Sequence, residues 1–330
     1  MPSESSRRIV LGLVVGVPVS ALFLWLAVRS ADLGTVRRTL GDADLGEVAL
    51  AVVALCAVYG FQAARWRSVA AAPQVHLARF YEMVVSAVAC NNVLPARLGD
   101  LLRARWLGRE AGIPAGRGLG TVVLDRGCDV AALLLLLVVG LAAVASSDWL
   151  VTIAAGAAAA LVGLAAVVLF ARAYTGRRER DRRNRGLVRR VVRDTAEALA
   201  EPIGRRRPVV WVALSLAAWA VWALGAILVA RSLGFELGLL EAMFVAAVMN
   251  LGVAIPSSPG FVGTYEWLGV ASLGLLGIAS EEALAFSILL HACWYVPTTV
   301  GGGLAIVARA LLRVRRARAT RAAAATIDSS

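Results

Sequence analysis

Residues 91–109 read NNVLPARLGDLLRARWLGR and lie between two apolar runs of the chain. The stretch holds two adjacent amides, a proline, two glycines, an aspartate and four arginines. A charged side chain at bilayer depth costs about 2.5–3.5 kcal/mol on insertion scales, so a chain that only needed to sit in lipid would not collect such groups here. A distant stretch, residues 250–266, reads NLGVAIPSSPGFVGTYE and interrupts the apolar sequence in the same manner. We therefore interpret the remaining sequence as a scaffold around two polar interruptions.

The composition predicts an all-α polytopic integral membrane protein. Of the 330 residues, 59% are hydrophobic and 17% are charged, whereas a soluble protein of this length needs more charge on its surface. The apolar runs are continuous rather than alternating, which favours membrane-spanning helices of about 20 residues over the strands of a barrel. The net charge of +12 comes with no lysine in the chain. Because basic residues collect in the cytoplasmic loops of membrane proteins, we expect the membrane, and no nucleic acid, as partner.

The apolar runs predict about six full spans and two broken or re-entrant helix pairs. The full spans are expected at 9–28, 48–64, 119–145, 149–171, 209–230 and 283–308, and the broken pairs at 80–110 and 239–278. Residues 29–47 are expected to form an exterior loop. Arg65-Trp66-Arg67, at the end of the second span, are interpreted as an aromatic and basic anchor at the membrane interface.

The chain is predicted to form one transmembrane domain over residues 1–330. Its first half is 1–171, its arginine-rich loop 172–208, its second half 209–308 and its basic tail 309–330. The positive-inside rule places both termini and the arginine-rich loop in the cytoplasm.

The two broken pairs share an order of residues. Each contains an asparagine, then a proline, then a glycine, namely Asn92, Pro95 and Gly99 in the first and Asn250, Pro256 and Gly260 in the second. The first pair enters from the inside and the second from the outside, as in an inverted-topology repeat whose discontinuous helices meet near the midplane. The alternative is coincidence, because these residue types end helices anywhere. Pro95, Gly99, Pro256, Pro259 and Gly260 are the hinge candidates.

Charged residues near the breaks are the candidates for binding a substrate. Arginine suits a phosphate because its planar fork donates two parallel hydrogen bonds, and a lipid headgroup supplies a phosphate in this setting. The substrate-binding candidates are Asn92, Arg97, Asp100, Arg103, Asp125, Arg126, Asp129 and Glu266. Two alternatives stay open. Asp125 and Asp129 would neutralise Arg126 in a buried network, and arginines of residues 98–110 would lie on an interfacial amphipathic helix with Leu98, Leu101, Leu102 and Trp106 on its apolar face.

The sequence predicts no metal site and no cofactor. The four cysteines are far apart and lack metal-ligand spacing, and the chain has only two histidines. The glycines at 301–303 lack the context of a phosphate-binding loop and are interpreted as a site of close helix packing.

Three motifs together resemble a known family. Residues 91–109, then GLGTVVLDRGCDV at 118–130, then IPSSPGFVGTYE at 255–266, are similar to the flippase-like membrane family, the transmembrane region of lysylphosphatidylglycerol synthases. The resemblance implies a multi-pass protein of the bacterial plasma membrane that moves or handles aminoacylated phospholipids or polyprenyl-linked lipids. Asp100 stands where some members have glutamate. Full-length synthases continue into an aminoacyl-transferase domain, so the transfer activity is not expected of a chain that stops at residue 330.

The leading hypothesis is a lipid flippase or lipid-transport protein that binds an anionic headgroup and has no enzymatic domain. A second hypothesis is a membrane-embedded transferase on a lipid-linked substrate, with Asp100, Asp125 or Glu266 as the acid or base. The sequence contains no metal-ligand cluster, nucleophile motif or nucleotide loop that would favour it. A third hypothesis is a scaffold for a separate partner enzyme.

Overall fold

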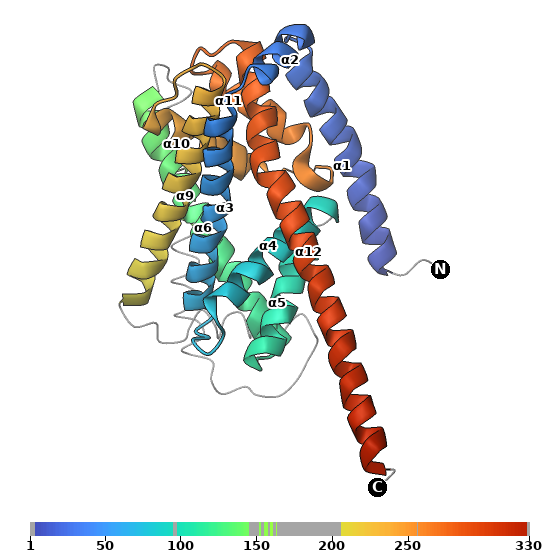
Figure 1. The fold of residues 1–330 in the computed structure, drawn as a ribbon. Coiled ribbons are helices and arrows are strands. Elements are labelled where there is room, and N and C mark those ends of the chain that lie inside the picture. Colours follow the sequence, from blue (N-terminus) through green and yellow to red (C-terminus); the bar gives the residue numbers. More distant parts are fainter. Residues whose placement is uncertain are drawn as a thin grey trace.

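The computed structural model is a bundle of helices (Figure 1). It describes residues 4–94, 98–144, 206–255 and 257–328, with a few helical positions between 152 and 163. The helices are α1 (Glu4–Val28), α2 (Leu33–Gly41), α3 (Leu45–Val69), α4 (Leu77–Val93), α5 (Leu98–Ala111), α6 (Ala115–Val144), α9 (Arg206–Ser232), α10 (Leu239–Gly252), η2 (Pro259–Phe261), α11 (Thr264–Gly274) and α12 (Ser280–Asp328). The described part of the chain contains no strand, so the prediction of an all-α protein is confirmed.

Some of the predicted features lie outside the described residues. These are the fourth predicted span at 149–171, apart from isolated helical positions, most of the arginine-rich loop, and the residues Pro95, Arg97 and Pro256.

Several described helices are long and apolar enough to cross a membrane. Three meet this criterion alone, Leu45–Val69, Arg207–Ser232 and Ser280–Arg315, and the pair Gly16–Val28 and Leu33–Gly41, bent by 84°, is a fourth if it forms one span. Large apolar side chains also cover the outside of the bundle, as at Leu45 and Leu304. Such a surface is stable against lipid and not against water. The chain is therefore a multi-pass membrane protein. Its described part contains three or four candidate spans, so the predicted number of about six is not confirmed.

The expectation of a loop over residues 29–47 is wrong, because these residues contain α2. The carboxylate of Asp32 accepts hydrogen bonds from the backbone N–H groups of Gly34 and Thr35, each at 3.1 Å, and so caps the helix start. Val36 on the buried side packs against Leu284 and other residues of α12. The cap at Asp32 and the packing on α12 together stabilise this short polar segment as a helix.

The helices of the two halves pack reciprocally. Side by side, α3 and α9 run in opposite directions (Figure 1). Helix α4 packs on α12, and α10, its counterpart, packs on α6. Contacts of α3 with α6 and α12 are likewise matched by contacts of α9 with α12 and α6. Exchanging α3–α6 for α9–α12 thus reproduces these packing pairs, which supports the predicted inverted repeat over coincidence.

Glycines allow the helix backbones to approach closely at two matching crossings, that of α4 with α12 and that of α6 with α10. A Cβ atom added at Gly302 of α12 would lie 2.5 Å from the carbonyl oxygen of Val85 in α4. At the matching crossing, a Cβ atom on Gly140 of α6 would lie 2.7 Å from Cβ of Phe244 in α10. Small residues of this kind let helix backbones approach within a membrane, where van der Waals packing drives association. In the 301–303 triplet, only Gly302 has such a neighbour within 4 Å.

The two breaks meet beside α12. Gly260 in η2 has φ of +75°, and a Cβ atom there would lie 3.2 Å from the carbonyl oxygen of Asn92 and 2.8 Å from Cε2 of Tyr295. Both the backbone conformation and the lack of space require glycine at this position. The predicted hinge residue Gly260 is therefore where the second break touches the end of α4.

Replacing Gly302 with alanine should destabilise the protein, because the new methyl group would overlap the carbonyl of Val85. Overpacking of this kind typically costs about 1–3 kcal/mol. We expect Gly302→Ala to lower the thermal unfolding midpoint of the purified protein in detergent. Gly303→Ala is the matched control, since a Cβ atom at Gly303 meets nothing within 4 Å and alanine favours a helix. Equal midpoints for the two variants would contradict the proposed crossing.

Candidate functional site

Six charged side chains gather where α3, α5 and α6 meet. This ion cluster consists of Arg65, Asp100, Arg103, Asp125, Arg126 and Asp129. It carries three positive and three negative charges, so these side chains balance. Burying a charge is costly unless it is paired and hydrogen-bonded, and the balance explains how the cluster is tolerated inside the bundle.

Arg65 is the centre of the ion cluster. Its side chain has no exposed surface, and its Nε and Nη1 atoms each lie 2.8 Å from a carboxylate oxygen, of Asp125 and Asp129 respectively. The two aspartates are four residues apart and therefore share one face of α6. Nη1 also donates to the hydroxyl of Ser215 in α9 at 2.9 Å. One arginine thus joins three helices.

Arg103 occupies the second buried position. Its Nη1 atom lies 3.2 Å from Oδ2 of Asp125, and its Nε atom lies 3.3 Å from Oδ1 of Asp100. The guanidinium sits over the ring of Trp66, 4.8 Å from its centroid, in a cation–π contact. Its Nη2 atom is buried without a hydrogen-bond partner in the described part of the chain. Nε has no hydrogen bond there either, although it lies within ion-pair distance of Asp100, so Arg103 keeps unused donors.

Arg126 forms the accessible edge of the ion cluster. Its side chain is 40% exposed, against 0% for Arg65 and 2% for Arg103. Nη2 lies 3.0 Å from Oδ1 of Asp100, and Nη1 lies 3.5 Å from Oδ2 of Asp129. Because Asp100 uses the same oxygen for Arg103 and Arg126, an anion that reached Arg126 would compete with a carboxylate that is already shared.

A second polar pair occupies the matching place in the other half. Oε1 of Glu266 lies 2.6 Å from Nδ1 of His291, and both side chains are buried. Glu266 is the third residue of α11 and His291 the twelfth of α12, just as Asp100 is the third of α5 and Arg126 the twelfth of α6. Each half thus carries one polar pair between its short helix and the long helix that follows.

Glu266 also holds the start of its own helix. Its Oε2 atom accepts a hydrogen bond from the backbone N–H of Gly263 at 2.5 Å, which closes the first turn of α11. Rings of Tyr265 and Trp294 surround His291, the latter stacked with centroids 5.0 Å apart. The environment of this pair is therefore aromatic, whereas the other pair lies among charges.

The predicted site residues fall into separate groups in the structure. Asp100, Arg103, Asp125, Arg126 and Asp129 lie together in the ion cluster, and Glu266 lies in the other half. The amide of Asn92 donates to Thr299 at 2.8 Å and to Thr298 at 3.4 Å, so it fastens α4 to α12.

Three predicted hinge residues have defined surroundings. The backbone N–H of Gly99 donates to Asn91 Oδ1 at 2.8 Å, which ties the start of α5 to the end of α4. Pro259 begins η2, and Gly260 touches Asn92 as described above.

The interpretation of Arg65-Trp66-Arg67 as an interfacial anchor is wrong for the first two residues. Arg65 and Trp66 are fully buried, and the Trp66 indole donates to the hydroxyl of Thr121 at 3.0 Å. The partners of Arg65 lie 60 and 64 positions later, so no local pattern reveals the burial. Arg65 is accordingly the functional candidate that the sequence analysis missed.

The expected orientation of residues 98–110 is also corrected. Helix α5 buries Gly99, Arg103, Ala104 and Leu107, while Leu101 of the apolar face is 53% exposed. In a membrane bundle the lipid accepts leucine on the outside, and a charge is stable on the inside when it is paired.

Removing Arg65 should leave Asp125 and Asp129 buried without their main partner. Breaking a buried ion pair from one side costs about 3–5 kcal/mol, so we expect Arg65→Met to lower the thermal unfolding midpoint strongly. The double variant Arg65→Met, Asp129→Asn should recover part of the loss, because it leaves two positive and two negative charges in the ion cluster. Arg105→Met is the matched control, since Arg105 is exposed on α5. The same midpoint for Arg65→Met and Arg105→Met would sink the central role of Arg65.

Comparison with known proteins identifies the family of this chain. The chain is 28% identical to the glycosyltransferase AglD of Haloferax volcanii over an alignment of 341 positions, which covers 90% of this chain and 54% of that relative. The chain therefore spans about half the length of the curated relative it matches. The model of the lysylphosphatidylglycerol synthase TM region matches residues 9–302, which include both breaks and all six residues of the ion cluster. The chain belongs to the family of lysylphosphatidylglycerol synthase transmembrane regions.

Proposed function

We propose that this protein is a lipid flippase or lipid-transport protein that binds the anionic headgroup of a membrane lipid. The observation that carries the proposal is the pair of reciprocal halves, each with a polar pair between its short helix and the long helix that follows. Transporters with inverted repeats commonly bind substrate between the repeats, where discontinuous helices meet. Membership of the lysylphosphatidylglycerol synthase transmembrane family adds a membrane-lipid setting.

The ion cluster is the proposed place for the headgroup phosphate. Arg126 is partly exposed, and Arg103 has a donor without a partner among the described residues. A phosphate at Arg126 would take over hydrogen bonds that Asp100 now accepts, and charge-assisted bonds of this kind are the strong ones. Loosening Asp100 from Arg126 would also loosen α5 from α6. Binding of the headgroup and movement of the first broken pair would then be linked.

The proposed substrate-binding residues therefore have different roles. Arg103 and Arg126 would bind the headgroup phosphate, Asp100 is the carboxylate that the phosphate would displace, and Asp125 and Asp129 hold the arginines in place. Glu266 belongs to the second half, and Asn92 joins the two halves through its hydrogen bonds to α12. Arg97 remains a proposed headgroup ligand from its position in the sequence alone.

The similarity to a glycosyltransferase supports a second candidate. In that reading the chain is the membrane-embedded part of a transferase, or the scaffold of a separate partner enzyme, acting on a lipid-linked substrate. Asp100 or Glu266 would then be the acid or base. Asp125 suits this role less, because both of its oxygens are engaged by arginines. The two candidates share the lipid and differ in whether a covalent bond changes.

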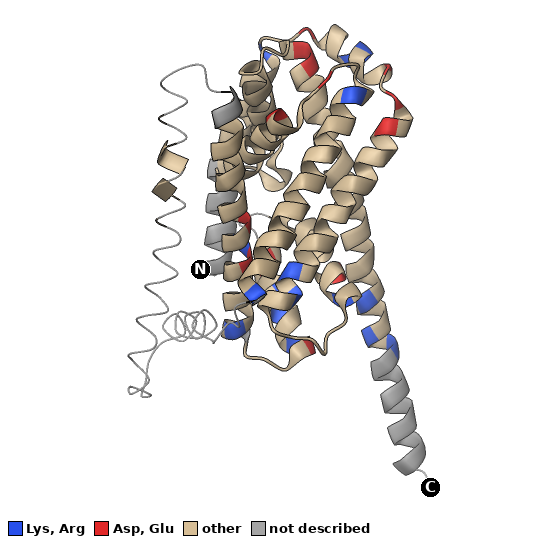
Figure 2. Cartoon of the chain, turned by 90° about the vertical axis from the view of Figure 1, so that its left-hand side faces the viewer, with Lys and Arg blue, Asp and Glu red and all other residues tan. Residues whose placement is uncertain are grey.

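The proposal places the protein in the bacterial plasma membrane with both termini in the cytoplasm. Basic residues gather at the end of the bundle from which α12 projects (Figure 2). The positive-inside rule assigns such an end to the cytoplasm.

Transport of a labelled lipid tests the proposal. We expect Arg126→Gln to slow translocation of fluorescent phosphatidylglycerol in proteoliposomes, measured by chemical quenching of the outer leaflet, by about tenfold or more. The reason is that a hydrogen bond to a charged group contributes about 1.5–3 kcal/mol. Asp100→Asn should change the rate as well, because Asp100 holds the resting position of Arg126.

Arg105→Gln is the control for a lost surface charge and should transport at the unaltered rate. Unchanged transport in Arg126→Gln would remove Arg126 from the site. Mass spectrometry of the same lipids identifies the competing activity, since a new lipid product formed by the purified protein would favour the transferase over the transporter.

A further inference from the structure

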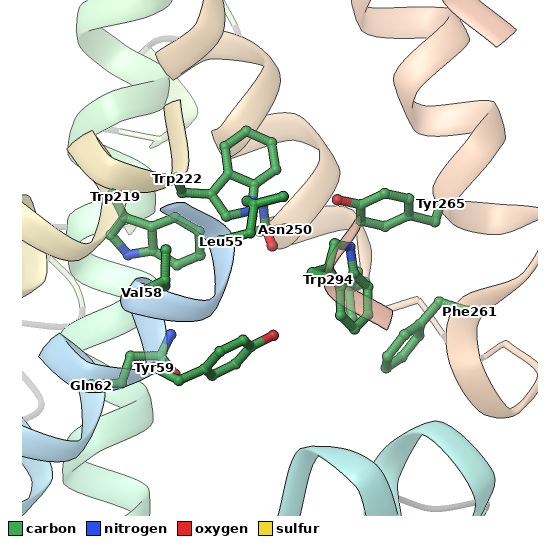
Figure 3. A pocket seen from close by; sticks show the side chains of 11 residues that line it. Leu55, Val58, Tyr59, Gln62, Trp219, Trp222, Asn250, Phe261, Tyr265 and Trp294 are labelled. Carbon is green, nitrogen blue, oxygen red and sulfur yellow. The ribbon is translucent and has the colours of Figure 1, made fainter. Parts of the chain in front are cut away.

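An aromatic cavity of about 100 Å³ lies between the two halves of the protein. It is bounded by α3, α9, α10, α11 and α12, and none of the described residues that line it is charged. Its wall includes the aromatic and amide side chains of Tyr59, Gln62, Trp222, Asn250, Tyr265 and Trp294 (Figure 3). Each of these five α-helices contributes at least one of them, and Phe261 of η2 also lines the cavity.

Neutral polar groups face the centre of the aromatic cavity. The hydroxyl groups of Tyr59 and Tyr265 and the side-chain oxygen of Asn250 point into it (Figure 3). The amide nitrogen of Asn250 donates to the carbonyl of Ala246 at 2.8 Å, which leaves its oxygen as an acceptor toward the cavity. Tyr265 is 1% exposed; the indole of Trp294, which can only donate, lies beside its hydroxyl, and the hydroxyl proton has no acceptor in the described part of the chain. Buried polar groups are normally satisfied, so this hydroxyl indicates a place for a ligand or a water molecule.

The aromatic cavity is adjacent to the ion cluster. On α3, Tyr59 lies six residues before Arg65, and Gln62 lies three residues before it. With a rise of 1.5 Å per residue, Tyr59 and Arg65 are about 9 Å apart along the helix axis. On α9, Ser215, which accepts from Arg65, is followed at four and seven residues by Trp219 and Trp222 of the cavity wall. Two helices thus carry both sites side by side.

We propose that the aromatic cavity binds an uncharged sugar, presented as the headgroup of a lipid whose phosphate lies at Arg126. A sugar ring has apolar faces that pack on aromatic rings and a rim of hydroxyl groups that exchange hydrogen bonds with tyrosine, asparagine and glutamine. A quaternary ammonium group also binds among aromatic rings. It fits less well, because no carboxylate among the described residues lines the cavity, and a buried charge needs a partner.

The proposal rests on the proposed function for the lipid and adds the class of headgroup. In this arrangement the phosphate at Arg126 of α6 and the sugar against Tyr59 and Gln62 of α3 occupy neighbouring places. The charged part meets arginine, and the neutral part meets rings and amides.

Titration calorimetry on the full chain in phosphatidylethanolamine nanodiscs tests the proposal, since such discs contain no sugar-headed detergent. The ligands are a short-chain polyprenyl phosphate carrying one hexose, the same lipid without the hexose, the free hexose, and a short-chain phosphocholine lipid. We expect the hexosyl lipid to bind about tenfold more tightly than the lipid without hexose, as two or three added hydrogen bonds would give.

Two variants locate the preference. Tyr265→Phe removes only a hydroxyl group, and Asn250→Leu removes the acceptor at nearly constant volume. Each should lower the affinity ratio of the two polyprenyl lipids by about two- to threefold, the share of one hydrogen bond, while leaving the affinity for the lipid without hexose unchanged. Tyr81→Phe is the control, because Tyr81 is an exposed tyrosine on α4, outside the cavity. Tyr59→Phe provides a further test if either variant fails to fold.

The outcomes separate this proposal from the function on which it rests. Equal affinity for the lipids with and without hexose, or tighter binding of the phosphocholine lipid, would overturn the sugar site. Binding of the free hexose that depends on Tyr265, without any gain from the lipid, would keep the sugar site and assign it to a free sugar. That same result, together with absent lipid transport, would reject the proposed function and leave the cavity as a sugar site.

Discussion

Arg65 carries a positive charge with no exposed surface, and the arrangement of the first half depends on keeping it paired. Two carboxylates one helical turn apart on α6 and a hydroxyl on α9 surround it. A shift of α3 by a single residue would rotate the guanidinium by about 100° away from these partners. The pairing therefore fixes the register of α3, and with it the positions of Tyr59 and Gln62 in the cavity wall.

The two halves repeat one geometry with different chemistry. Asp100 and Arg126 belong to a cluster of six charges, whereas Glu266 and His291 form a single pair among aromatic rings. Arg126 brings a permanent positive charge into its pair, whereas the partner of Glu266 is an imidazole ring enclosed by Tyr265 and Trp294. The two matching positions thus hold different kinds of polar contact.

Sequence reasoning predicts the parts that depend on local pattern. The apolar runs indicate the helical class, and the asparagine, proline and glycine order marks both breaks; α5 begins at residue 98, as expected. Local sequence pattern cannot reveal the burial of Arg65, because the aspartates that pair with it come 60 or more residues later. The aromatic cavity is missed for the same reason, since its wall combines residues from five helices. The helix at Leu33–Gly41 is not predicted, because the polar composition of this segment indicates a loop. Its cap at Asp32 and the burial of Val36 become evident only in the structure.

The length of α12 has a mechanical consequence. Its 49 residues extend for about 74 Å at 1.5 Å per residue, more than twice the thickness of the hydrocarbon core. The crossing with α4 at Gly302 lies about 40 Å from the far end, which projects beyond the other helices (Figure 1). If α12 moves as a rigid rod about that crossing, a tilt of 10° displaces its end by about 7 Å. The helix would therefore act as a lever that converts a small change between the halves into a large displacement of its arginine-rich end.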